Sequence, residues 1–262
     1  MINPLQGLRV LNTRPLSQAD KLNHAIQNAG GIPLSLPGLT IEATKTDWLD
    51  QMPDLKTIRQ AIFVSTNAVH YFFNAFKEAN ILWPDTIRVT AVGMATSAAL
   101  LNHGVHAHHI PQIASSEHLL KSASLQNINN QTILLIKGDG GRTLISEEVQ
   151  ARGAKLTSLI VYRKIMPKIK QEYIDSLWRD DAVDIILFTS QQAMQNIFHL
   201  FGEKRQAWLQ SKSCLVISNR LAEIASLFGI RTIITCQYDD ILDALVRYKK
   251  GHRHDNTSKH ND

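Results

Sequence analysis

One short stretch decides the fold of this chain: AIFVSTNAVHYFFNAF at residues 61–76. Its first four residues are apolar, which is typical of a buried β-strand. Apolar side chains then recur from residue 68 onward, and this pattern predicts a helix over residues 68–76. Polar residues of the kind that begin helices separate the two segments. The stretch therefore predicts a strand, a short turn and a helix.

The same unit recurs along the chain. We predict five further strands at residues 10–13, 89–92, 133–136, 185–188 and 215–217, followed by helices over 21–29 and 96–102 and by helices ending at Gly153, Phe201 and Gly229. Phe63-Val64-Ser65 has a counterpart in Phe188-Thr189-Ser190, an offset of 125 residues. Strands that alternate with helices form parallel sheets with right-handed crossovers. We therefore predict a duplicated α/β protein with two doubly wound, flavodoxin-like lobes.

Two extended segments do not fit a single strand–helix unit. They cover residues 32–43 and 155–165, occupy equivalent places in the two repeats and lie near prolines. Two such strands can run antiparallel between lobes as a hinge. This predicts lobe 1 from residues 1–37 and 168–246, lobe 2 from residues 43–162, hinge strands at 38–42 and 163–167, and five strands in each lobe. A simple division near residue 125 is the alternative.

Composition narrows the class of protein. The net charge is +5, and much of it falls in residues 247–262, which lack apolar periodicity and are predicted to be a disordered basic tail. The remainder lacks the basic stripe of a nucleic-acid binder. No stretch reaches the ~20 apolar residues of a membrane span. Cys214 and Cys236 form neither a zinc pattern nor a disulfide framework, so we expect a reducing, cytoplasmic location.

Candidate functional residues lie in the turns after six predicted strands, where parallel sheets place their ligand sites. These turns are Thr13-Arg14-Pro15, Ser65-Thr66-Asn67, Gly93-Met94-Ala95-Thr96, Lys137-Gly138-Asp139-Gly140-Gly141-Arg142, Thr189-Ser190-Gln191-Gln192 and Ser218-Asn219-Arg220. All are small or polar, and Asp139 is their one carboxylate. Helix amino termini attract anions, and arginine and lysine add full charge. Ordinary helix capping is the alternative for each turn taken alone.

Other motifs fail their tests. The glycine turn at residues 138–141 begins like a dinucleotide-binding fingerprint, but position 143 is a threonine and the third glycine of that fingerprint is missing. The next predicted strand ends with Tyr162 and not with the acidic residue that would bind a ribose. No nucleotide-binding phosphate loop of the G-x-x-x-x-G-K-[ST] type occurs in the sequence. Four histidines between residues 103 and 109 lack a nearby carboxylate or thiol, so we predict no metal site. The Tyr162 phenol either faces a cleft or is a half-buried strand residue.

Several motifs resemble those of the uroporphyrinogen-III synthase family over residues 10–245. They are Thr13-Arg14-Pro15, Phe63-Val64-Ser65-Thr66-Asn67-Ala68, Ala91-Val92-Gly93-x-x-Thr96, Lys137-Gly138-Asp139-Gly140-Gly141-Arg142, Ala151-Arg152-Gly153-Ala154, Val161-Tyr162 and Val216-Ile217-Ser218-x-Arg220-Leu221-Ala222. Leu221 stands where the repeat of Thr96 would fall, and Ser218 replaces the counterpart of Gly93. These departures argue against the same role for the turn at residues 93–96 and its repeat at residues 218–221.

The resemblance implies a two-lobed lyase of tetrapyrrole (haem) biosynthesis. It would cyclise hydroxymethylbilane to uroporphyrinogen III, inverting ring D through a spiro intermediate and losing water, with neither cofactor nor metal. Tyr162 would be the candidate acid. The predicted substrate-binding residues are Arg14, Ser65, Thr66, Asn67, Gly93, Thr96, Lys137, Gly138, Gly140, Arg142, Thr189, Ser190 and Ser218. We expect a monomer that contacts the preceding deaminase transiently.

Two rival functions remain open. A non-catalytic two-lobed protein that binds an anionic metabolite would share the anion-binding turns. A nucleotide-dependent transferase is disfavoured by the incomplete glycine fingerprint.

Overall fold

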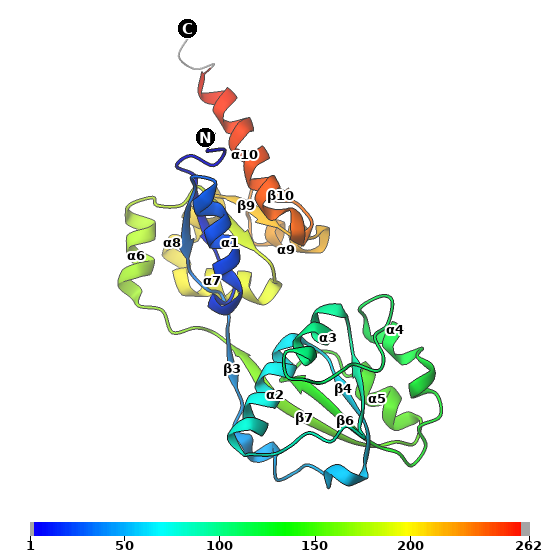
Figure 1. Ribbon diagram of the computed structural model, residues 1–262. Helices are drawn as coiled ribbons and strands as arrows, with labels where there is room; N and C mark the ends of the chain where they lie inside the picture. The colour runs from blue at the N-terminus through cyan, green and yellow to red at the C-terminus, as the bar shows by residue number, and fades with distance from the viewer. Residues whose placement is uncertain (1–2, 258–262) are drawn as a thin grey trace. The chain divides into compact units, whose positions relative to one another are not determined.

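The computed structural model describes residues 3–257, and the contacts within the chain divide it into two units (Figure 1). Unit 1 comprises residues 1–40 and 165–262, and unit 2 comprises residues 41–164. The chain therefore crosses between units at residues 40/41 and 164/165, and it is not divided near residue 125. The hinge role of these crossings stays a prediction.

Unit 1 contains a five-stranded sheet whose neighbouring strands are all parallel. Its order is β10 (Ile233–Thr235), β9 (Ser213–Val216), β8 (Ile185–Phe188), β1 (Arg9–Asn12) and β2 (Ile32–Ser35). Counted within the unit, this is the doubly wound order 2-1-3-4-5. The order reverses between β1 and β8, so the switch point of the sheet lies there.

Helices cover both faces of this sheet. On one face α1 (Leu16–Asn28) and α10 (Ile241–Thr257) bury Ile26 and Leu245 against Val10 and Leu187. On the other face lie α6 (Gln171–Arg179), α7 (Gln191–Phe201), α8 (Glu203–Ser211) and α9 (Asn219–Leu227). Side chains alternate across a strand, so successive apolar residues of β1 and β8 supply both cores.

Unit 2 has a similar sheet, but the strand at one of its edges comes first in the sequence of the unit. Its sheet runs β3 (Thr40–Ala43), β7 (Lys155–Ile165), β6 (Thr132–Gly138), β4 (Ile58–Phe63) and β5 (Arg88–Ala91). The pairs β4–β5, β4–β6 and β6–β7 are parallel, and the switch point lies between β4 and β6. The edge strand beside β7 is therefore β3, the segment by which the chain first enters the unit.

Two separate cores hold this second sheet. Helices α2 (Thr66–Glu78) and α3 (Met94–Leu101) pack on the face that carries Phe63, where Phe72 stacks at 5.5 Å from the Trp48 ring. Helices α4 (Ser116–Leu120) and α5 (Leu144–Ala151) cover the face that carries Ile62. Short 3-10 turns occur at Thr46–Trp48 (η1), Leu55–Thr57 (η2), Ala123–Leu125 (η3) and Tyr238–Asp240 (η4).

The predicted fold class is confirmed, as are the six strand–helix pairs and the five strands in each unit. Helix α1 begins at Leu16, five residues before the predicted start, because its first turn carries few apolar residues. The sequence also failed to indicate β10, α4, α6 and α8. No helix in the described range is both long and apolar enough to cross a membrane.

Two predictions about extended or unstructured segments are wrong. Residues 32–43 do not form one long strand: β2 and β3 belong to different sheets, and Pro37 and Gly38 lie between them. A Cβ at Gly38 would lie 2.6 Å from the Ala193 carbonyl oxygen, and the Asn196 amide donates to the Gly38 carbonyl at 2.7 Å. This close contact with α7 fixes the end of the first segment.

The predicted disordered tail at 247–262 is also wrong over residues 247–257, where α10 continues to Thr257. Ala244 and Leu245 anchor the first turns of this helix in the core, and a helix that is already nucleated extends at small cost. Residues 258–262 of the predicted tail lie outside the described range.

Candidate functional site

All six predicted turns follow the carboxyl ends of parallel strands. In unit 1 they follow β1, β8 and β9, and in unit 2 they follow β4, β5 and β6. Because parallel strands end at the same edge of a sheet, each unit gathers three turns along its carboxyl edge. We call these the unit 1 edge and the unit 2 edge. That both edges bind one substrate stays a prediction.

At the unit 2 edge, Tyr162 reaches the switch point. Its hydroxyl lies 3.1 Å from Ser65 Oγ in the turn after β4. Its ring lies over Gly138 at the end of β6, where an added Cβ would come within 2.4 Å of Tyr162 Cζ. The ring also stacks on Tyr71 at 5.9 Å. Tyr162 is 7% exposed, so one strand residue joins the two turns on either side of the switch point.

The serines of three turns act as helix caps. Ser65 Oγ accepts from the Ala68 N–H at 3.1 Å, Ser190 Oγ from Ala193 at 3.1 Å, and Ser218 Oγ from Leu221 at 3.3 Å. The capping alternative therefore holds for these side chains. Each cap satisfies one of the four amide donors that open a helix, and the first ones remain for a ligand.

The remaining residues of the β4 and β5 turns differ in exposure. Thr66 and Asn67 open α2 and are half-buried. Gly93 caps α3 without a side chain, and a Cβ there would lie 2.8 Å from Ala114 Cβ. Thr96 is 4% exposed. Contact with a ligand at α3 therefore falls mainly to backbone amides.

The glycine turn after β6 combines charge and backbone freedom. Lys137 is half-buried. Gly140 has φ +70°, and no atom lies within 4 Å of an added Cβ, so this backbone faces open space. Arg142 Nη1 lies 2.7 Å from Glu117 Oε1 in an exposed ion pair. The charge of Arg142 is therefore partly balanced, which the sequence pattern did not reveal.

At the unit 1 edge, Arg14 and Arg220 face neutral partners. Arg14 Nη2 donates to the Tyr238 hydroxyl, and Arg14 Nε is buried without a hydrogen-bond partner. Arg220 Nη2 lies 3.3 Å from Gln191 Oε1. Thr189 and Ser190 are half-buried in the turn after β8, directly before Gln191.

Sequence reasoning missed Tyr238 and the partner role of Gln191. Tyr238 follows β10, a three-residue strand that gave no periodic signal. Tyr71 was likewise assigned only to a helix, although it supports the Tyr162 ring and donates to the Ile41 carbonyl at 2.8 Å.

The histidine-rich segment runs beside β5, where the His108 N–H donates to the Val89 carbonyl at 2.8 Å and the His109 carbonyl accepts from the Ala91 N–H at 3.0 Å. His103 Nε2 lies 3.4 Å from His70 Nδ1, and desolvation together with the His70 charge lowers the pKa of His103. Within the described residues, no group of three potential ligands could hold a metal ion.

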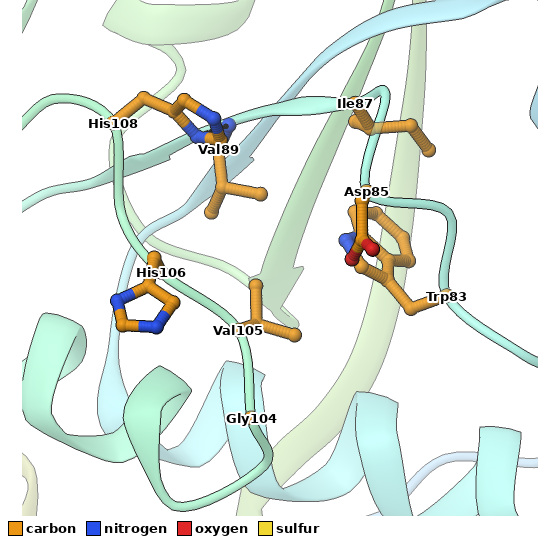
Figure 2. A pocket seen from close by; sticks show the side chains of 8 residues that line it. All are labelled: Trp83, Asp85, Ile87, Val89, Gly104, Val105, His106 and His108. Atoms are coloured by element: carbon orange, nitrogen blue, oxygen red, sulfur yellow. Dashed lines mark hydrogen bonds between the residues drawn. The ribbon is translucent and has the colours of Figure 1, made fainter.

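A pocket of about 200 Å³ lies beside this segment, next to the amino end of β5 (Figure 2). Its lining residues are Trp83, Asp85, Ile87, Val89, Gly104, Val105, His106 and His108. None of the predicted site residues lines it.

Fold and site together define a two-unit α/β protein whose parallel sheets present amide-rich turns suited to an anionic ligand. The sequence profile of the family described as uroporphyrinogen-III synthase HemD matches residues 20–243. This chain belongs to the uroporphyrinogen-III synthase family.

Individual relatives agree with the profile. The uroporphyrinogen-III synthase of Escherichia coli K12 is 29% identical, over 92% of this chain and 99% of its own length. That of Chlorobaculum parvum is 26% identical, over 88% and 94%. The crystal structure of a mutant uroporphyrinogen III synthase from Thermus thermophilus has a TM-score of 0.63 and 17% identity, over 95% of this chain and 100% of that one. The Helicobacter pylori enzyme gives 0.61 and 14%, over 94% and 99%. These two structures share the fold.

Proposed function

We propose that this protein is a cyclising lyase of tetrapyrrole biosynthesis that converts hydroxymethylbilane into uroporphyrinogen III. The observation that carries the proposal is the family profile, which extends over residues 20–243 and so includes parts of both units. The reaction inverts ring D and releases one molecule of water.

The charge of the two edges supports this substrate class. Hydroxymethylbilane carries an acetate and a propionate on each of four rings, so it is a polyanion. Helix amino termini favour anions by their free amides and by the helix dipole. Among the residues of the six turns, Asp139 is the one carboxylate, whereas Arg14, Lys137, Arg142 and Arg220 are cationic. The substrate-binding role of all thirteen predicted residues remains part of this proposal.

Tyr162 is our candidate for the acid that assists loss of hydroxide. The terminal C–O bond breaks, the phenol gives its proton to the departing hydroxide to form water, and the chain is left with an electrophilic methylene carbon. The Ser65 hydroxyl lies 3.1 Å from the Tyr162 oxygen and can donate a hydrogen bond to the resulting phenolate. Attack on the substituted carbon of ring D forms the spiro intermediate, the bond from that carbon to its original methylene bridge then breaks, and the freed methylene carbon bonds to the unsubstituted carbon of ring D. The hydrogen on that carbon leaves as a proton when the pyrrole regains its aromaticity, and it returns to Tyr162, so the net change is the loss of one water.

Most of the catalytic effect would come from positioning. The methylene carbon must meet the substituted carbon of ring D to form the spiro intermediate, whereas the unassisted chain closes at the unsubstituted carbon. Fixing a near-attack geometry can supply up to about 7–11 kcal/mol. Carboxylates held at several amide-rich turns would impose such a shape.

Three finer points belong to the same proposal. We propose a cytoplasmic location, which suits the free thiols of Cys214 and Cys236. We also propose a monomer and a transient contact with the preceding deaminase. Sedimentation of the protein alone and with deaminase tests both points.

Genetic complementation tests the function. We expect the gene to restore haem-dependent growth to a bacterial strain that lacks its own uroporphyrinogen-III synthase. A non-catalytic binding protein for an anionic metabolite would be expressed without restoring growth, and that result would favour the rival function.

A further inference from the structure

A contact across the unit 1 edge joins two turns that are far apart in the sheet. Tyr238 begins η4 just after β10, and Arg14 follows β1, so β9 and β8 lie between their strands. Arg14 Nη2 donates to the Tyr238 hydroxyl, and Arg14 Cζ lies 4.9 Å from the centre of the Tyr238 ring. The tyrosine therefore holds the guanidinium through both its ring and its oxygen.

In the part of the chain that the structure describes, no carboxylate balances the positive charge of Arg14, whereas three other cations of the unit are paired. Arg9, Arg205 and Lys212 each pair with an aspartate. Among the described residues, no carboxylate lies within 4.0 Å of the Arg14 nitrogens, although Asp239 and Asp240 directly follow Tyr238 in sequence. A phenol orients a guanidinium without neutralising it, whereas a carboxylate in its place would pair with it.

Arg14 also retains unused donors. A guanidinium carries five N–H groups. Within the described residues its side chain makes one hydrogen bond, to Tyr238, and its Nε is buried with no partner. A buried donor without an acceptor is costly, and a carboxylate oxygen is the acceptor that a guanidinium binds most strongly.

We infer that Tyr238 is a positioning residue that holds Arg14 ready to bind one carboxylate of the polyanionic substrate. This inference rests on the proposed function. Arg14 touches the substrate, and Tyr238 acts only through Arg14. The neighbouring pair of Arg220 and Gln191 follows the same pattern, a cation held by an uncharged acceptor.

A double-mutant experiment tests this dependence. We compare wild type, Arg14→Ala, Tyr238→Phe, Tyr238→Leu and the Arg14→Ala/Tyr238→Leu double variant, with Tyr173→Phe as a control on the exposed side of α6. The readouts are KM and kcat for type III product, and the dissociation constant for uroporphyrin, a stable macrocycle with eight carboxylates, measured by its fluorescence.

We expect Tyr238→Leu to raise KM and the uroporphyrin dissociation constant about tenfold, the factor for one lost charge-assisted hydrogen bond. Tyr238→Phe should fall between this variant and wild type because it keeps the ring, and kcat should change less than KM. The double variant should be no weaker than Arg14→Ala alone. A residue with a merely structural role would add its loss to that of Arg14→Ala.

Additive losses in the double variant, wild-type affinity in Tyr238→Leu, or no uroporphyrin binding by wild type would each overturn the inference. The binding readout separates this failure from that of the proposed function. A protein that makes no type III product but still shows the coupled loss of uroporphyrin affinity would refute the enzyme and retain the positioning role of Tyr238.

Discussion

The Tyr162 ring lies so close to Gly138 that a Cβ on the glycine would be 2.4 Å from Tyr162 Cζ. The register of β6 and β7 shifts at this point, from Lys137 opposite Ile160 to Gly138 opposite Tyr162. The missing side chain lets the ring lie across the end of β6 and brings its hydroxyl to Ser65. Gly138 therefore serves the site by making room for the tyrosine, besides any contact with substrate.

Gly138→Ala should displace the tyrosine ring. We expect it to lower the free energy of unfolding by about 1–3 kcal/mol, as overpacking does, and to lower the rate of type III formation. Urea unfolding and a kinetic assay on the same preparation measure both effects. Gly104→Ala is the matched variant, because an added Cβ there meets open space, the position has a positive φ of +74°, and Gly104 is not among the predicted site residues. Equal kinetic losses in the two variants would contradict the spacing role.

Tyr162→Phe should keep the ring packing and remove only the hydroxyl. We expect kcat for type III product to fall at least tenfold, with a free energy of unfolding within about 1.5 kcal/mol of wild type, since a single hydrogen bond to Ser65 is lost. Tyr71→Phe is the control, because its hydroxyl binds the Ile41 carbonyl away from the turn. Unchanged turnover in Tyr162→Phe would remove the phenol from the mechanism.

The repeat was visible in the sequence because buried parallel strands are apolar throughout, and their helices begin at small polar residues such as Ser65 and Ser190. The same local pattern located the six turns. Three-residue β10 carries too few side chains to show a period, so Tyr238 could not be placed. The balancing of Arg142 by Glu117 depends on a tertiary contact between α4 and the glycine turn, which spacing along the chain does not encode.

The break at Pro37 and Gly38 was hidden for a related reason. Apolar residues continue through 32–43, so the segment resembles one strand, while the contact of Gly38 with Ala193 arises only when the unit folds. The helical continuation of residues 247–257 was missed because the helix is anchored by Leu245, upstream of the polar part.

Glu117→Gln should release the charge of Arg142. If Arg142 meets a substrate carboxylate, we expect KM to fall about twofold, the modest scale of an exposed ion pair, and the gain to vanish in high salt. Steady-state kinetics at two ionic strengths measures this. Glu148→Gln removes the same charge near Arg152 and should leave KM unchanged. An equal fall in both variants would point to net charge alone.

The Arg9–Asp184 ion pair should make unit 1 sensitive to acid. Desolvation opposes ionisation of Asp184, but hydrogen bonds from the Arg9 side chain and backbone and the guanidinium charge outweigh it and lower the pKa of Asp184. A carboxyl whose pKa is lowered by folding stabilises the protein above its unfolded pKa of about 3.9, and that stabilisation is lost as pH falls through the folded pKa.

Asp184→Asn should therefore lower the free energy of unfolding by about 1 kcal/mol at pH 7, a small value because both side chains of the pair are about one-third exposed. Below about pH 4, the free energy of unfolding of this variant should fall less steeply with decreasing pH than that of wild type. Urea unfolding at pH 7 and in that acid range measures both. The control Asp180→Asn changes an exposed carboxyl that has no ion pair within the described residues. This control should leave the fall of the free energy of unfolding below about pH 4 as it is in wild type. If the free energy of unfolding of Asp184→Asn fell below about pH 4 as steeply as that of wild type, the ion pair would not be the source of the acid sensitivity.

The central claim concerns the isomer of the product. Porphobilinogen and deaminase are incubated with and without this protein, and the oxidised products are separated by chromatography. We predict that deaminase alone gives type I uroporphyrinogen, and that the added protein diverts the product to type III. Type I product in both reactions would contradict the account.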